Sequence, residues 1–281
     1  MSAANGFWSR ARRHRSFVAG GALTSLLIAT ALLSLIWTPY GPTKMSLRYR
    51  LKLPSPEHWL GTDQYGRDIL SIIMAGAQNS ISVGVVSVSI GLVIGVGMGL
   101  LAAARRGWIE EVTMRASDFA FAFPAILLAI MLVAAIGPGS VNAIIAIGVF
   151  NIPIFARLTR GAAAAVWTRE FVLAARAAGK GLTRISVEHV LPNITAVIVV
   201  QGTVQFAIAI LAEAALSYLG LGAQPPAPSW GRMLSEAQTM IYINPMLAVY
   251  PGIAIAISVL GLNLLGDGLR DLIDPRLARQ R

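Results

Sequence analysis

Long runs of apolar residues dominate the chain and alternate with shorter segments that carry most of its charge. Six of these runs contain no Lys, Arg, Asp or Glu: Phe17–Trp37, Ser80–Ala104, Phe119–Ile136, Val141–Ala156, Ile194–Ala212 and Met246–Gly266. A helix needs roughly 20 apolar residues to cross the hydrocarbon core of a bilayer. The fourth run is the weakest, because it is short and contains Asn142, Asn151 and Pro153. The pattern predicts an all-α membrane protein with six transmembrane helices.

Composition and charge support this prediction and add an orientation. The 281 residues are 56% hydrophobic and 13% charged, which is too apolar for a typical soluble domain. The first run follows a group of arginines, as a secretory signal does, but it is too long and lacks a small-x-small cleavage site. An even number of spans places both termini on one side, and a cytosolic assignment gives that side most of the 23 Lys and Arg residues. The net charge of +10 therefore indicates membrane topology rather than nucleic-acid binding.

Several classes of site are disfavoured by the residues that are missing. The chain has no Cys, which excludes a disulfide framework, a thiolate nucleophile and a Cys-ligated metal. Its three histidines lie far apart in sequence, so no metal-ligand spacing exists. An intramembrane enzyme needs a nucleophile and a base at depth, and no span contains a His or paired Asp. A stand-alone secondary carrier is less favoured, because neither repeat symmetry nor intramembrane ionisable residues are clear.

The second run carries glycines at intervals of four, Gly91, Gly95 and Gly99. This spacing places them on one face of a helix and leaves that face as bare backbone. Helices in lipid associate by close contact, and small residues permit it. We interpret the stripe as a helix-packing surface, with a pore-lining role as the less favoured alternative.

The stretch "LAARAAGKGLTRISVEHVLPN", from Leu173 to Asn193, contains an Ala-Gly-Lys-Gly that is reminiscent of a phosphate-binding loop. That loop requires G-x-x-x-x-G-K-[ST], in which glycines allow backbone N–H groups to face the phosphates. Here Ala174 stands at the first glycine position and Gly181 at the hydroxyl position. No strand precedes the stretch, and no acidic partner for a metal follows one. The sequence therefore predicts no nucleotide site in this chain.

The same stretch instead predicts two short helices on the cytosolic side. Residues 169–178 are rich in Ala and favour helix, and Gly179 and Gly181 interrupt them. A second short helix is expected over Leu182–Val190, and Pro192 is expected to open the fifth span, where its missing N–H costs nothing. Such an element can dock a partner or lie along the membrane surface as an amphipathic linker.

The stretch resembles the EAA loop of ABC-importer permeases, whose pattern is E-A-A-x3-G followed by hydrophobic-Leu-Pro. Residues that fit the pattern or its peptide-permease version are Ala174, Ala175, Arg176, Gly179, Leu191, Pro192 and Asn193. Leu173 departs from it, since the pattern has Glu there. Glu170, one helical turn earlier, is a candidate to replace the missing carboxylate.

Three further stretches are similar to segments of a narrower group, the DppC/OppC-like permeases of peptide and nickel importers. They are "HWLGTDQYGRDILSIIMAGAQNSISVG" (58–84), "AEAALSYLGLGAQPPAPSWGRML" (212–234) and "NLLGDGLRDLIDPRL" (263–277). All four stretches occur in the family's order and cover just under a third of the chain. Glu213 lies in the stretch 212–234 and follows the fifth span. For this residue the likeness favours a contact at an outer interface over a role as a substrate ligand.

The resemblance implies an ABC transmembrane type-1 bundle with a cytosolic coupling helix, in a bacterial inner (cytoplasmic) membrane. It divides the chain into a basic arm, first helix and outer segment (1–75), a type-1 domain (76–266) and a cytosolic tail (267–281). The implied partners are a second homologous permease, two cytosolic ABC ATPase subunits, a periplasmic or lipid-anchored substrate-binding protein and membrane lipid. The chain itself is expected to bind no cofactor and to have no ATPase site, with ATP and Mg on the partner ATPases.

The substrate class is open at this level. The resemblance implies import of di- or oligopeptides, with nickel or nickel chelates as the alternative. A missing Cys/His cluster does not decide between them, because nickel can arrive already chelated.

Overall fold

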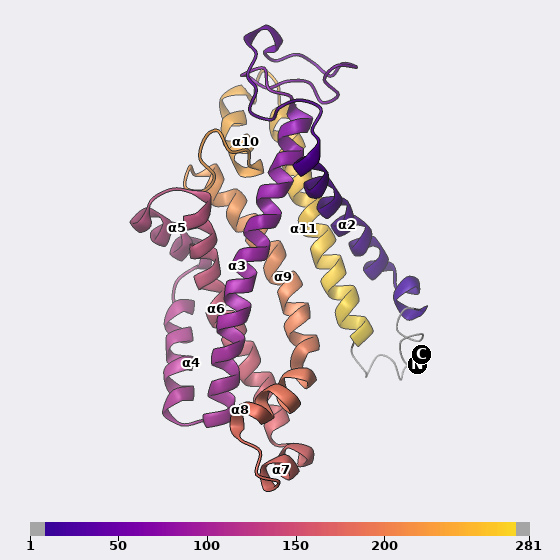
Figure 1. Ribbon diagram of the computed structural model, residues 1–281. Coiled ribbons are helices and arrows are strands. Elements are labelled where there is room, and N and C mark those ends of the chain that lie inside the picture. The colour runs from indigo at the N-terminus through magenta and orange to yellow at the C-terminus, as the bar shows by residue number, and fades with distance from the viewer. Residues whose placement is uncertain (1–8, 274–281) are drawn as a thin grey trace.

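The computed structural model describes residues 9–273 and shows an elongated bundle of helices (Figure 1). Parts of the expected basic arm and cytosolic tail, 1–8 and 274–281, lie outside the described residues. The long helices are α2 (Arg15–Ile36), α3 (Ile69–Arg105), α6 (Ser140–Trp167), α9 (Leu191–Tyr218) and α11 (Met246–Ile273). The shorter elements are η1 (Leu47–Tyr49), α4 (Trp108–Phe121), α5 (Ala125–Ile136), α7 (Glu170–Ala177), α8 (Leu182–Ile185), η2 (Ser186–Val190), α10 (Trp230–Ala237) and η3 (Gln238–Met240).

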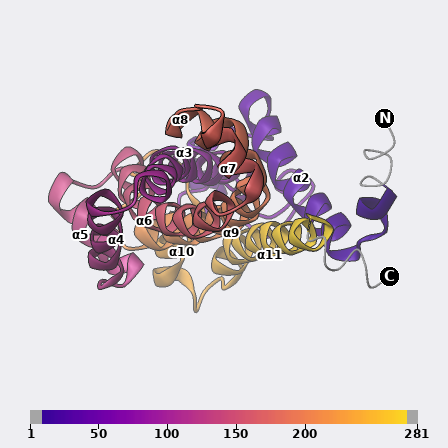
Figure 2. The same ribbon diagram turned by 90° about the horizontal axis from the view of Figure 1, so that it is seen from below.

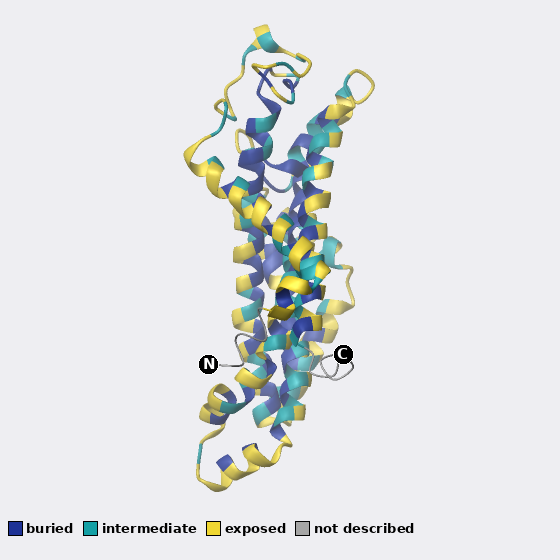
Figure 3. Ribbon diagram, turned by 90° about the vertical axis from the view of Figure 1, so that its right-hand side faces the viewer, coloured by how far each residue is buried: buried dark blue, intermediate teal, exposed yellow. Residues whose placement is uncertain are grey.

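Five helices of the described part are long and apolar enough to cross a membrane, and a bent pair, α4 with α5, supplies a sixth crossing if it counts as one span. Many apolar residues of these helices are exposed, and Figure 3 colours the exposed positions along the ribbon yellow. Exposed apolar side chains suit contact with lipid, since lipid tails are as apolar as leucine. The all-α architecture and the expectation of six spans agree with this arrangement.

The third expected span, Phe119–Ile136, is wrong as a single straight helix. Its first residues end α4, the helix breaks over 122–124, and α5 leaves at an angle of 90°. Pro124 stands immediately before α5 with φ −56°. Because a proline disfavours helical backbone in the residue before it, the helix is prone to break at this position.

The fourth expected span is longer than the sequence indicated. Pro153 lies inside α6, which continues without interruption for 28 residues. The bundle centre forms where α6 packs along α3, with α9 against both (Figure 2). On the other flank α2 packs along α11.

The outer segment folds over the end of the bundle, and its last residues already belong to α3. Asp68 caps α3 by accepting a hydrogen bond from the backbone N–H of Ser71. Arg67 is buried and pairs with Asp63, in the same segment, and with Glu236 on α10. Burial by itself lowers the pKa of Arg67, but the two carboxylates hold it above its ordinary value. This buried pair of bridges fixes the outer segment to α10.

Candidate functional site

The site expected from the sequence, Leu173 to Asn193, forms the end of the bundle opposite the outer segment (Figure 1). α6 ends at Trp167, and α7 begins three residues later. Val172 and Ala175 on α7 are buried, in the same apolar cluster as Ile185 and Val190 of the following elements. α7 is therefore packed against the base of the bundle by one face only.

Gly179 makes the turn that ends α7. Its φ is +80°, in the left-handed region that glycine adopts at no steric cost. The N–H of Gly179 donates to the carbonyl of Arg176 and the N–H of Lys180 donates to the carbonyl of Ala175. These two bonds define a Schellman cap, the arrangement in which helices most often need glycine. A Cβ at Gly179 meets nothing within 4 Å, so the need for glycine comes from the backbone alone.

Pro192 lies in the first turn of α9, as expected, but the second expected helix runs into α9 without a break. Leu182 to Tyr218 runs as one helix of 37 residues, with a π-helical turn at Ser186–Val190. In that turn the N–H of Leu191 donates to the carbonyl of Ser186, five residues earlier. Such a turn accommodates the proline that follows, because the freed carbonyls are no longer in α-helical register. The element at this end of the bundle and the fifth span are thus one continuous rod, Leu182–Tyr218.

An exposed cluster of charges joins the turn to this rod. The Lys180 ammonium donates to Glu188 at 2.7 Å and lies 3.0 Å from Nε2 of His189. Arg184 donates to the other oxygen of Glu188 at 2.6 Å. The i, i+4 spacing of Arg184 and Glu188 is visible in the sequence, but the pairing of Lys180 with both residues depends on the turn at Gly179. The cluster holds the end of α7 close to the start of the rod.

The outward face of α7 is a mixture of apolar and charged residues. Leu173 is 51% exposed, and Phe171 and Ala174 beside it are also exposed. Glu170 and Arg176 are exposed at the two ends of the same helix. Ala175, at 8%, points into the bundle instead. Its small size therefore matches the packing within this chain.

Leu191 and Pro192, the last residues of the EAA-like pattern, lie where the π turn passes into α9. They stand on the rod, whereas Glu170 to Gly179 stand on α7 and its cap. The structure therefore brings the two parts of the pattern together as one α7–turn–rod unit.

Glu213 lies inside the molecule and not at an exposed outer surface. The residue is 1% exposed, and its Oε1 accepts hydrogen bonds from Asn79 at 2.9 Å, Ser217 at 2.7 Å and Ser229 at 2.8 Å. These donors come from α3, from α9 and from the residue that precedes α10. Glu213 therefore joins three segments at the outer end of the bundle, and the sequence could not show this because two of the donors are distant in the chain.

The glycine stripe lies against α6. A Cβ at Gly95 stands 2.5 Å from the carbonyl oxygen of Ile152, and one at Gly99 stands 2.6 Å from that of Ala156. Gly91 faces Asn151 in the same manner. The backbones of α3 and α6 approach so closely that a side chain larger than hydrogen does not fit between them.

Comparison with known proteins gives a consistent result. The family described as "Binding-protein-dependent transport system inner membrane component" matches residues 91–279. The chain is 44% identical over 272 residues to the glutathione transport system permease protein GsiD of Pectobacterium atrosepticum, covering 96% of this chain and 90% of the relative. It is 42% identical over 266 residues to the dipeptide transport system permease protein DppC of Alkalihalophilus pseudofirmus, covering 95% and 88%.

A solved structure supports the fold. The fold of this chain is similar to that of a chain in the inward-facing structure of the MetNI methionine ABC transporter, with a TM-score of 0.60 and 20% sequence identity. The match covers 72% of this chain and 97% of that one. At this identity the likeness shows a shared fold and nothing about substrate.

Proposed function

The chain belongs to the binding-protein-dependent transport system inner membrane component family, and from this premise we propose that it imports di- and oligopeptides as the permease subunit of an ABC transporter. The observation that carries this is the similarity, over almost the whole chain, to permeases for glutathione and for dipeptides. Glutathione is itself a tripeptide, so both relatives point to peptide-like cargo. Nickel, the alternative that the sequence left open, is not favoured.

Energy for transport is proposed to come from partner subunits. The relatives are permeases and not ATPases, and this chain is likewise a transport subunit without an ATPase site of its own. The family's name implies a substrate-binding protein outside the cell. We assign ATP and Mg to two cytosolic ATPase subunits and expect a second homologous permease to complete a heterodimer. Both termini then lie on the cytosolic side of the inner membrane, as the distribution of Lys and Arg favours.

The geometry of α7 and the rod supports a coupling mechanism. The exposed face of α7 docks on an ATPase subunit, and its cap at Gly179 connects it to a helix that runs without a break into the fifth span. When the ATPases close on ATP, α7 moves as a rigid body, and the rod transfers the displacement to the bundle. A stiff connection is essential, because a flexible loop would absorb the movement.

The transport function can be tested in proteoliposomes that contain the permease, its partner permease, both ATPases and the binding protein. ATP-dependent uptake of a labelled dipeptide and of glutathione is expected, and a Ni(II) chelate is the comparison substrate. Uptake is measured by filtration, with and without ATP. If the vesicles accumulate the nickel chelate and neither peptide, the proposed peptide substrate is wrong.

We expect Leu173→Ala to weaken binding of the ATPase subunits. Fully burying an exposed leucine contributes about 1.5–3 kcal/mol, and Leu173 is already half buried, so its truncation should weaken the affinity for the ATPase by roughly three- to tenfold. The fold should be unaffected, because Leu173 is half exposed and alanine favours helix. Val112→Ala on α4, at a position of similar exposure, is the matched control. Equal recovery of co-purified ATPase with both variants would show that Leu173 is not part of the docking surface.

A further inference from the structure

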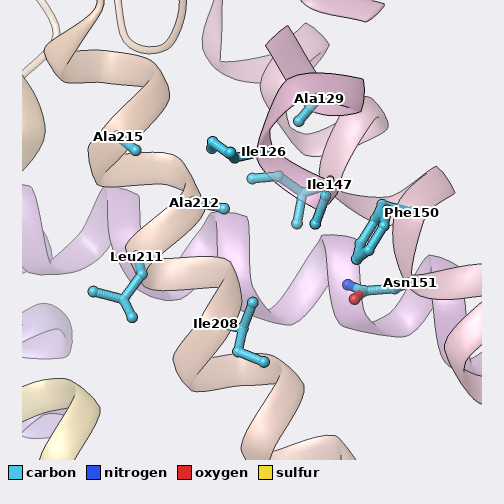
Figure 4. A pocket seen from close by; sticks show the side chains of 10 residues that line it. Ile126, Ala129, Ile147, Phe150, Asn151, Ile208, Leu211, Ala212 and Ala215 are labelled. Atoms are coloured by element: carbon cyan, nitrogen blue, oxygen red, sulfur yellow. The ribbon is translucent and has the colours of Figure 1, made fainter. Parts of the chain in front are cut away.

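An open apolar groove runs between α5, α6 and α9, near the middle of the bundle (Figure 4). Its volume is about 290 Å³, and its lining includes Ile126, Ile147, Phe150, Ile208 and Ala212. Among the described residues, no charged side chain lines it, and Asn151 is the one lining residue with a polar side chain.

The Asn151 side chain is in an unusual state for a buried amide. The residue is 2% exposed, and its Nδ2 has no hydrogen-bond partner within the described part of the chain. Buried polar groups are nearly always hydrogen-bonded, because an unmade bond costs free energy. Figure 4 shows the amide end directed from α6 into the space that Ile208 borders on α9. The amide end thus lies at the wall of the groove.

Close packing keeps the amide in this position. The Asn151 backbone and Cβ lie directly against Gly91 on α3, so the residue has little freedom to turn away. Eight residues further along α6, Thr159 lies against Gly99 in the same way, and its hydroxyl also has no partner in the described chain. Thr159 does not line the groove. Asn151 and Thr159 are therefore alike in their packing against α3, and they differ in that only Asn151 lines the groove.

We propose that this groove is one wall of the path taken by the peptide, and that Nδ2 of Asn151 donates a hydrogen bond to a carbonyl oxygen of the peptide backbone. The inference rests on the proposed function. Every peptide offers a backbone carbonyl whatever its side chains, so a single neutral donor in an uncharged wall recognises peptides as a class. The volume lies at the lower limit of small-molecule sites, which fits a passage whose other wall belongs to the second permease.

The test compares Asn151→Leu with Thr159→Val in the reconstituted complex. Leucine has the same branching and number of side-chain heavy atoms as asparagine but no donor, and valine stands in the same relation to threonine. We expect Asn151→Leu to lower the number of dipeptides transported per ATP hydrolysed by about fivefold, the effect of one net hydrogen bond. Thr159→Val should leave this ratio unchanged. Asn151→Ala, which removes the amide without adding bulk, should show the same fall as Asn151→Leu.

Two results would overturn the inference while leaving the proposed function intact. Unchanged dipeptide-to-ATP ratios in both Asn151 variants would show that the amide does not contact the peptide. Loss of the second permease on co-purification of both variants would assign Asn151 to a contact between subunits. Absence of peptide uptake by the wild-type complex would instead contradict the proposed function, and this inference with it.

Discussion

Replacing Gly179 with valine should reduce ATP-driven uptake to near background while the chain still inserts into the membrane. The φ of +80° at this residue is costly for any side chain with a Cβ, by roughly 1–2 kcal/mol, and more for a β-branched one. The chain can relieve this strain by opening the Schellman cap. α7 then loses its fixed angle to the rod, so movement of the ATPases no longer reaches the fifth span.

Gly181→Val is the matched control, two residues away. Gly181 also has nothing within 4 Å of a Cβ, but its φ is −70°, which valine adopts readily. Uptake, stimulation of ATP hydrolysis by loaded binding protein, and yield after detergent extraction are measured for both variants. Normal stimulation in Gly179→Val would contradict the role of the cap in coupling.

The spans could be predicted from the sequence because lipid leaves the backbone few choices. A segment in hydrocarbon must satisfy its N–H and C=O groups internally, so a long apolar run becomes a helix. The exposed, half-packed α7 and its end at Gly179 were predictable for a similar reason, since a left-handed cap is a local property of the chain.

Three prolines have different effects on their helices, and the local sequence does not distinguish them. Pro124 breaks its helix at 90°, Pro153 lies inside a continuous helix, and Pro192 follows a π turn inside a rod. In each case the ring removes one N–H and crowds the preceding turn. What differs is the context: α6 packs along α3 and continues through Pro153, whereas the rod shifts its hydrogen-bond register by one residue before Pro192.

Contacts between distant segments were the other part that the sequence could not provide. The likeness favoured a contact at an outer interface for Glu213, yet its carboxylate accepts hydrogen bonds from Asn79 and Ser229, which come from elsewhere in this chain. In the sequence, Asn151 was only one of the residues that weakened the prediction of the fourth span. Its significance depends on α5 and α9, which together with α6 leave a groove in front of the amide.

Gly95→Val is expected to prevent the bundle from forming correctly. The added Cβ alone would stand 2.5 Å from the carbonyl oxygen of Ile152 and 3.0 Å from the backbone N of Ala156. Both are backbone atoms in the middle of α6, so no side-chain rotation relieves the clash. Overpacking of this kind typically costs about 1–3 kcal/mol, and valine adds two methyl groups beyond the Cβ. Because packing contact is what holds helices together in lipid, α3 and α6 must separate along their length.

Gly97→Val separates this clash from any general effect of a larger residue in α3. Gly97 lies two residues further along the same helix, is exposed, and has nothing within 4 Å of a Cβ. Thermal unfolding in detergent and the fraction of monodisperse protein on size exclusion should be near wild type for Gly97→Val and strongly reduced for Gly95→Val. Equal stability of the two variants would mean that α3 and α6 do not meet backbone to backbone at this point, and that the glycine stripe has a different purpose.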